Sequence, residues 1–126
     1  MVKMTVDANI IIAYLAGDDL VVRALSEWRS SGQSIFLPTV AETEILSFSS
    51  WTDEERLSTE KFLEENFVSI PFDRSIARLA AELRRFYKIK LPDATIAATA
   101  LFTFSPLITR NDHDFKNIKN LQIIKI

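Results

Sequence analysis

Residues 91–101 read Leu-Pro-Asp-Ala-Thr-Ile-Ala-Ala-Thr-Ala-Leu, and this stretch decides the fold. Proline is favoured in the first turn of a helix, and an acidic side chain there suits the helix dipole, so Pro92 and Asp93 mark a helix start. No charged residue follows between Ala94 and Leu101. A helix without a charged face is expected to be buried.

Short strands alternate with helical segments on both sides of this stretch. Strands are predicted at residues 2–6, 34–38, 67–72, 106–109 and 121–126. Helices are predicted to begin at Asn9, after Asp18 or Asp19, at Thr39, after the capping box Thr52-Asp-Glu-Glu55, after Asp73 and at Pro92. Such alternation predicts an α/β fold, in which a five-stranded, mostly parallel sheet carries helices on both faces.

Composition bounds the class of protein. The chain has 126 residues, and we expect residues 1–126 to form one three-layer domain. Only 2 Gly and 4 Pro argue against an all-β sandwich, and the absence of Cys excludes disulfides and thiolate zinc sites. We see no signal peptide and no apolar run of about 20 residues, so we expect a cytoplasmic protein.

Charge is spread unevenly along the chain. The net charge is -2, with -5 on residues 1–63 and +3 on residues 64–126. The protein is therefore not a basic nucleic-acid-binding protein by bulk charge. Binding a nucleic acid would require a local basic patch, or a metal ion that neutralises the phosphates.

Acidic and amide side chains follow the predicted strands, where ligands of parallel sheets bind. They are Asp7, Glu42, Glu44, Asp73, Asn111, Asp112 and Asp114, and Asp93 opens the uncharged helix. Two carboxylates about 4 Å apart repel by roughly 4 kcal/mol at an effective dielectric of 20, so converging acids need protons or a cation. Oxygen ligands favour Mg²⁺ or Mn²⁺.

Each acid also has a structural explanation. Asp7 and Asp73 can cap the helices that follow them, and Asp112 and Asp114 can be turn residues. Glu42 stands three residues after Thr39 and fits a capping box, which we predict to be its role. Glu44 has no cap to make, and a carboxylate that leans toward apolar neighbours needs a partner. Only the convergence of these acids on one edge favours a site.

Four short motifs stand in order along the chain and resemble the PIN domain family, in particular the VapC-type toxins of bacterial and archaeal toxin–antitoxin pairs. They are Asp7-Ala-Asn9, Pro38-Thr-Val-Ala-Glu-Thr-Glu44-Ile-Leu46, Leu91-Pro-Asp93-Ala-Thr-Ile-Ala97 and Thr109-Arg-Asn111-Asp-His-Asp114-Phe115. The first resembles the family's D-x-N start, and the last resembles its closing T-x-N-x-x-D-F motif. Each motif alone is weak, whereas four in this order are more specific.

The resemblance implies a Mg²⁺- or Mn²⁺-dependent ribonuclease, usually a homodimer and usually paired with a small antitoxin protein. It implies four catalytic and metal-binding acids: Asp7, Glu44, Asp93 and Asp114. It implies supporting polar groups at Asn9, Thr109 and Asn111. Glu42 stays an alternative to Glu44, and Asp112 an alternative to Asp114. Candidate contacts to an RNA backbone are Arg84, Arg85, Lys88, Lys90, Arg110, Lys116 and Lys119.

Two other functions fit part of the pattern. A phosphoacceptor receiver domain would use Asp7, Asp73 and Thr109, although such domains carry paired acids after the first strand. A catalytically inactive PIN scaffold is the second alternative, and the intact acids argue against it.

Large apolar residues in the first four helices predict a partner surface. Trp51 precedes the cap Thr52, where we expect either a contact with its own helix or an exposed position. By the family resemblance, the groove between these helices would receive an amphipathic segment of an antitoxin.

Overall fold

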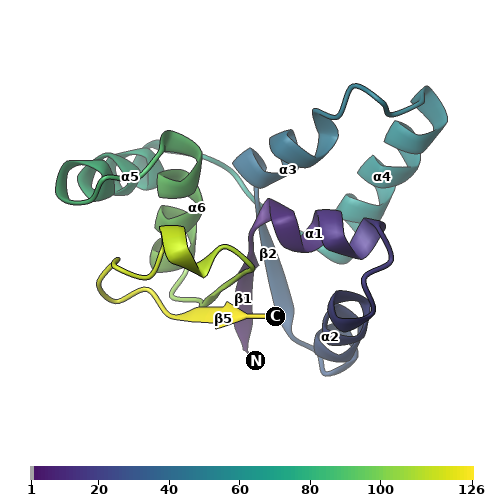
Figure 1. The fold of residues 1–126 in the computed structure, drawn as a ribbon, viewed down its shortest axis with the longest axis horizontal. Helices are drawn as coiled ribbons and strands as arrows, with labels where there is room; N and C mark the ends of the chain where they lie inside the picture. The colour runs from purple at the N-terminus through teal and green to yellow at the C-terminus, as the bar shows by residue number, and fades with distance from the viewer. Residues whose placement is uncertain (1) are drawn as a thin grey trace.

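The computed structural model describes residues 2–126 and contains one five-stranded sheet at its centre (Figure 1). The strands are β1 (Lys3–Val6), β2 (Ser34–Pro38), β3 (Val68–Ile70), β4 (Leu107–Thr109) and β5 (Ile123–Lys125). Their order across the sheet is β3-β2-β1-β4-β5, and every neighbouring pair is parallel. The predicted α/β class is confirmed.

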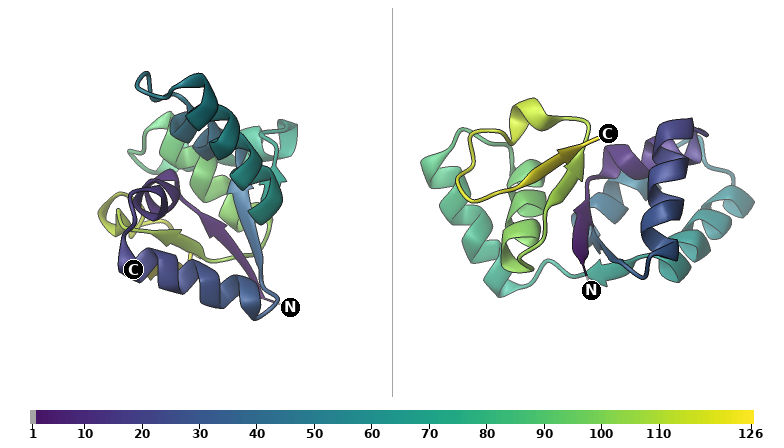
Figure 2. Two further views of the ribbon diagram at one scale, coloured as in Figure 1. Left: turned by 90° about the vertical axis from the view of Figure 1, so that its right-hand side faces the viewer. Right: turned by 90° about the horizontal axis from the view of Figure 1, so that it is seen from below.

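Helices cover both sides of the sheet. They are α1 (Ala8–Leu15), α2 (Asp19–Ser30), α3 (Thr39–Leu46), α4 (Asp53–Asn66), α5 (Arg74–Phe86) and α6 (Leu91–Phe102), with a 3₁₀ turn, η1, at Asp112–Asp114. Helices α5 and α6 lie on one side, and α1, α2 and α4 lie on the other (Figures 1 and 2). Within residues 2–126, no helix combines the length and apolar character needed to cross a membrane.

Helix α6 lies at the centre of the packing. All residues from Ala94 to Ala100 are buried, and the helix contacts β1, β2, α3 and α5. Its two buried threonines, Thr95 and Thr99, donate their hydroxyls to carbonyls of the preceding turn at 2.7 and 2.8 Å. The polar groups of α6 are thus satisfied within the helix, as burial requires.

Strands β1 and β4 bring distant parts of the sequence to the same point of the sheet. The register pairs Val6 with Ile108, and the amide of Asp7 donates to the Ile108 carbonyl at 3.0 Å. Because the strands are parallel, Asp7 and Thr109 emerge side by side at the carboxyl edge. This edge is also where α1 and α3 begin, directly after β1 and β2.

Helix starts agree with the sequence prediction at three places and differ at one. The side chains of Asp18, Thr52 and Asp73 cap α2, α4 and α5, and Thr52 forms the predicted box with Glu55. The predicted capping box at Thr39 is wrong. Pro38 occupies the N-cap position without a side-chain bond.

Thr39 is already the first residue of α3, so its side chain faces away from the helix end. Its hydroxyl accepts a hydrogen bond from the Phe72 amide at 3.2 Å, which ties α3 to the segment after β3. Glu42 therefore has no capping role.

The strand order excludes the receiver-like alternative. In the doubly wound order 2-1-3-4-5 of such folds, strand 3 lies beside strand 1. Here β3 is at the edge and pairs only with β2, so β2 separates the strand that precedes Asp73 from the central strand β1. Asp73 caps α5 instead.

The residue that follows the C-cap of α6 is unfavourable for the backbone conformation it adopts. Ser105 and Phe104 donate their amides to the carbonyls of Ala100 and Leu101, which is the Schellman pattern that ends many helices. Phe104 stands where glycine is usual, with φ of 55°, and its side chain is 93% exposed.

We expect Phe104→Gly to raise the free energy of unfolding by about 0.5–1 kcal/mol, because the left-handed conformation costs a residue with a Cβ about 1–2 kcal/mol. Denaturant unfolding measures this change. The control is Phe102→Gly. Phe102 is the last residue of α6 and is helical, so this substitution should lower the free energy of unfolding by a similar amount. A loss of stability in Phe104→Gly would contradict the assignment of strain.

Candidate active site

Asp7 is a buried carboxylate at the end of β1. Its Oδ1 accepts the Ala8 amide at 2.7 Å, and its Oδ2 accepts the Thr109 hydroxyl at 2.9 Å and the Asn9 amide group at 3.3 Å. Asp7 is thus both the predicted helix cap and the acid at the sheet edge. Burial raises the pKa of Asp7, although the bonds from Thr109 and Ala8 oppose that rise.

The predicted supporting residues join Asp7 to the last acid of the chain. Asn9 donates to the Thr109 hydroxyl and accepts the Arg110 amide, both at 3.3 Å. The Thr109 hydroxyl also accepts the Asn111 amide at 3.0 Å. Asn111 in turn donates its side-chain amide to Asp114 at 2.7 Å. One hydrogen-bond network therefore positions Asp7 and Asp114.

Glu44 and Asp93 complete a cluster of four acids from four elements. The pKa of Asp93 is raised by burial first, then by the negative charges of Asp7 and Asp114, while Lys90 opposes the rise. The pKa of Glu44 is raised by burial first, then by the charges of Asp7 and Asp93. The charges of Asp7, Asp93 and Asp114 thus act on one another, and Glu44 is coupled to Asp7 and Asp93.

The other candidate acids have different partners. Asp112 forms an ion pair with Lys125 at 3.3 Å, and this interaction lowers the pKa of Asp112. Asp73 caps α5. Glu44 is exposed to solvent, yet partial burial is the largest cause of its raised pKa, so the expectation that it leans on an apolar strip stays a prediction. These contacts favour Glu44 and Asp114 over Glu42 and Asp112.

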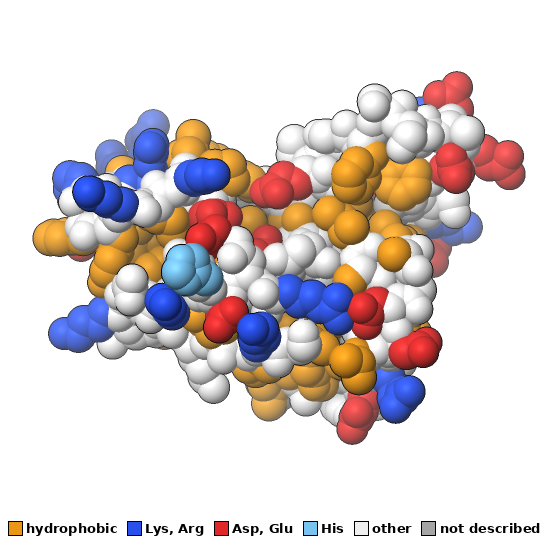
Figure 3. All heavy atoms as spheres, viewed as in Figure 1, with side chains coloured by type: hydrophobic (Ala, Val, Ile, Leu, Met, Phe, Trp, Pro, Cys, Tyr) orange, Lys and Arg blue, Asp and Glu red, His pale blue; other side chains and the backbone are white. Residues whose placement is uncertain are grey.

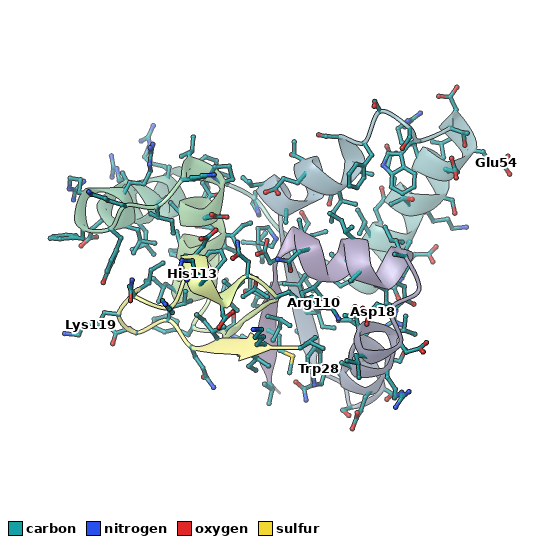
Figure 4. The ribbon with its side chains drawn as sticks, viewed as in Figure 1. Asp18, Trp28, Glu54, Arg110, His113 and Lys119 are labelled. Atoms are coloured by element: carbon teal, nitrogen blue, oxygen red, sulfur yellow. The ribbon has the colours of Figure 1, made fainter. Side chains whose placement is uncertain are left out.

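Basic side chains do not neutralise the cluster. Within residues 2–126, none of the four acids forms an ion pair, and Arg110, next to Thr109, pairs with Asp18 at 2.8 Å (Figure 4). Sequence reasoning missed this role of Asp18, because Arg110 and Asp18 are far apart in the chain and no pattern links them.

The donor set suits a hard divalent cation. The four carboxylates have raised pKa values or are coupled to a neighbouring acid, and none forms an ion pair within residues 2–126. A divalent cation would stabilise their charged forms, and all four offer oxygen ligands. Within residues 2–126, no three acidic or histidine side chains are already gathered around a single point. Mg²⁺ usually keeps several waters and takes only one or two carboxylates, so its binding does not require such a cage.

A polar pocket of about 260 Å³ opens beside the acids. Its lining includes two of the acids, Asp93 and Asp114, and the three lysines Lys88, Lys90 and Lys116. A larger groove, of about 690 Å³, lies between α5, α6 and the starts of β4 and β5, and its lining is mostly apolar. The acids are absent from that groove, so the small polar pocket is the better candidate site.

Sequence comparison identifies one family. The profile of the PIN domain family matches residues 4–121. Among curated proteins, none matches this chain.

Solved structures share the fold over nearly the whole chain. A chain from a toxin–antitoxin complex of Klebsiella pneumoniae is 30% identical, with a TM-score of 0.81 over 96% of this chain and 95% of that one. A chain from VapBC2 of Rickettsia felis, bound to a fragment of promoter DNA, is 20% identical, with a TM-score of 0.84 over 98% of both. A chain from VapBC-1 of nontypeable Haemophilus influenzae is 22% identical, with a TM-score of 0.83 over 98% of this chain and 97% of that one.

The acid cluster makes stability depend on pH. The ordinary pKa is 3.8 for Asp and 4.5 for Glu, and those of Asp7, Glu44 and Asp93 are raised in the folded protein. The folded protein therefore binds these protons more tightly than the unfolded chain does. This contribution to stability is fully present below the ordinary values and is lost as the pH rises through the raised ones.

We expect Asp93→Asn to stabilise the protein at pH 7, because within residues 2–126 the Asp93 carboxylate makes no hydrogen bond or ion pair that the substitution would break. The gain should be some tenths of a kcal/mol up to about 1, since solvent screens this half-buried group. It should shrink as the pH falls toward 3.8. Thermal unfolding across pH measures it, and Asp112→Asn, which breaks the pair with Lys125, should give no gain.

Proposed function

This chain belongs to the PIN domain family, and we propose that it is a divalent-metal-dependent endoribonuclease that acts as the toxin of a toxin–antitoxin pair. One observation carries the proposal: the charges of Asp7, Asp93 and Asp114 act on one another, Glu44 is coupled to Asp7 and Asp93, and none of the four acids forms an ion pair within residues 2–126. A cation bound by oxygen ligands would remove their repulsion. A catalytically inactive PIN scaffold, the alternative, would not account for the presence of these four unpaired acids.

Asp7, Glu44, Asp93 and Asp114 would hold the ion. When bound there, Mg²⁺ or Mn²⁺ would acidify a water molecule and neutralise charge on the scissile phosphate. Asp7 is suited to the task because its Oδ1 accepts only the Ala8 amide and keeps a lone pair for another ligand.

Three polar side chains would keep these acids in place. Thr109 and Asn9 hold Asp7 Oδ2 through donated hydrogen bonds, which fixes the rotation of the carboxylate. Asn111 holds Asp114 in the same way. We assign these three residues a positioning role, and no histidine or covalent nucleophile is needed.

The toxin role rests on the neighbours and on a surface beside α4. Toxin–antitoxin complexes recur among the similar structures, which supports a small cognate antitoxin as partner. A shallow pocket of about 330 Å³ is lined by Leu15, Trp51 and residues of α4. Trp51 is half-buried, donates to the Ile45 carbonyl at 3.0 Å and packs edge-on against Phe48.

This pocket would take an apolar side chain of the antitoxin. Figure 3 shows the apolar side chains that gather between α3 and α4, rimmed by acidic ones. We also propose that the free protein is a homodimer and that it acts in the cytoplasm.

We expect Asp7→Asn, Asp93→Asn and Asp114→Asn to abolish RNA cleavage, and EDTA to abolish it in the unaltered protein. Glu44→Gln should do the same, whereas Glu42→Gln and Asp112→Asn should cleave normally. Asn9→Ala should lose about 10- to 100-fold, as residues that orient ligands do. Cleavage of a labelled RNA measures these rates.

A binding readout accompanies these rates, because a contaminating nuclease could mimic activity. Mg²⁺ should raise the melting temperature of the unaltered protein but not of Asp7→Asn. Equal cleavage by Asp7→Asn and the unaltered protein would overturn the proposed site.

We expect Leu15→Asp to prevent association with the proposed cognate antitoxin, and Trp51→Ala to weaken it. The physical reason is that a charge, or a void, replaces an apolar contact. Co-expression followed by size-exclusion chromatography measures association, and Phe104→Ser is the control on a distant surface. Co-elution of Leu15→Asp at normal yield would rule out this surface.

A further inference from the structure

Exposed basic side chains gather where α5 ends and the chain crosses to α6 (Figure 3, left). They are Arg84, Arg85, Lys88 and Lys90. Arg84 donates Nε to the Ile89 carbonyl at 3.3 Å, and the other three make no hydrogen bond or ion pair within residues 2–126. These cations are therefore available to a ligand.

The crossing segment is anchored to the core. Tyr87 and Lys90 have extended backbones, with φ of -126° and -69°. Tyr87 and Ile89 are half-buried and pack against the core, and the Tyr87 hydroxyl accepts the Lys119 amide at 3.0 Å. Lys88 and Lys90 are both exposed, and both line the same pocket.

This segment leads directly to the acid cluster. Lys88 and Lys90 line the polar pocket of about 260 Å³ together with Asp93 and Asp114, and Lys116 joins them from the loop after η1. His113 of η1 lies at the same pocket (Figure 4). A polyanion lying on the lysines would place its next phosphate beside the acids.

Phe86, the last residue of α5, adds an aromatic platform. Its side chain is 73% exposed, although burial would be favourable for an apolar ring. It lines a second hollow, of about 530 Å³, whose wall is residues 84–90. Aromatic rings set among cations bind unpaired bases by stacking, whereas bases within a duplex are already stacked on one another.

We propose that residues 84–90 and Lys116 form a binding track for single-stranded RNA. Phe86 stacks on an unpaired base, and Lys88, Lys90 and Lys116 bind backbone phosphates. The strand then passes from the end of α5 across the polar pocket to the acids. This assignment rests on the proposed ribonuclease function and adds which side of the site the substrate occupies.

Binding is measured with a labelled single-stranded RNA of about ten nucleotides, within the usual site sizes. EDTA is present so that cleavage does not interfere, and the salt concentration is varied. Each of Lys88→Gln, Lys90→Gln and Lys116→Gln should make the slope of log K against log salt less negative by about 0.7, the value for one lost phosphate contact on a single strand.

Phe86→Ser should weaken binding by about tenfold without changing that slope, because stacking releases no counterions. The matched controls are Lys61→Gln, which is exposed on α4, and Phe72→Ser, whose ring is exposed at the opposite end of α5 from Phe86. Both controls should bind RNA normally. Unchanged affinity and slope in the track variants would overturn the proposal.

Two further outcomes distinguish this proposal from its alternatives. Tighter binding of duplex RNA than of the single strand, or loss of self-association rather than RNA affinity in Phe86→Ser, would overturn the single-strand track. If the unaltered protein cleaves RNA but the lysine variants bind and cleave equally well, the track fails and the ribonuclease stands. If the variants lose RNA affinity while no metal supports cleavage, the proposed activity fails and the track stands.

Discussion

The carboxylate of Asp7, buried at the end of β1, is the constraint on which the site depends. Burial favours its neutral form, yet three donors from Ala8, Thr109 and Asn9 are arranged to favour the charged form. Ala8 and Asn9 are neighbours of Asp7 in the chain, but Thr109 reaches Asp7 only because β1 pairs with β4 in one register. A shift of that register would remove Thr109 from Asp7 and break the network that continues to Asp114.

Charge is distributed so that the acids stay unneutralised while cations lie nearby. Arg110, the basic residue closest in sequence to the network, is held by Asp18. Lys125 is held by Asp112. Lys90 is free, and it is near enough to Asp93 to oppose the rise in its pKa. The field at the carboxyl edge is therefore negative at its centre and positive along one flank, which is the arrangement expected where a metal and a polyanion bind together.

Local patterns predicted much of the fold, and long-range contacts explain the rest. The uncharged stretch of α6, the caps at Thr52 and Asp73 and the alternation of strands and helices are local, so the sequence alone indicated them. Thr39 was misassigned because its hydroxyl bonds to Phe72, a contact that no short window contains. The family resemblance favoured Asp114 over Asp112, and the ion pair between Asp112 of η1 and Lys125 of β5, which no local pattern indicates, supports that choice.

Helix α6 carries Asp93 in its first turn and is enclosed by β1, β2, α3 and α5 along its buried length. Because close-packed interiors have little free volume, a shift at one point of α6 moves the rest of the helix. Enlarging one of its small side chains, such as Ala97 or Ala100, would push the helix along or away from its neighbours and carry Asp93 with it. The spacing of the acids is thus a mechanical property of the whole core, and residues that never meet a substrate set the geometry at which it would be held.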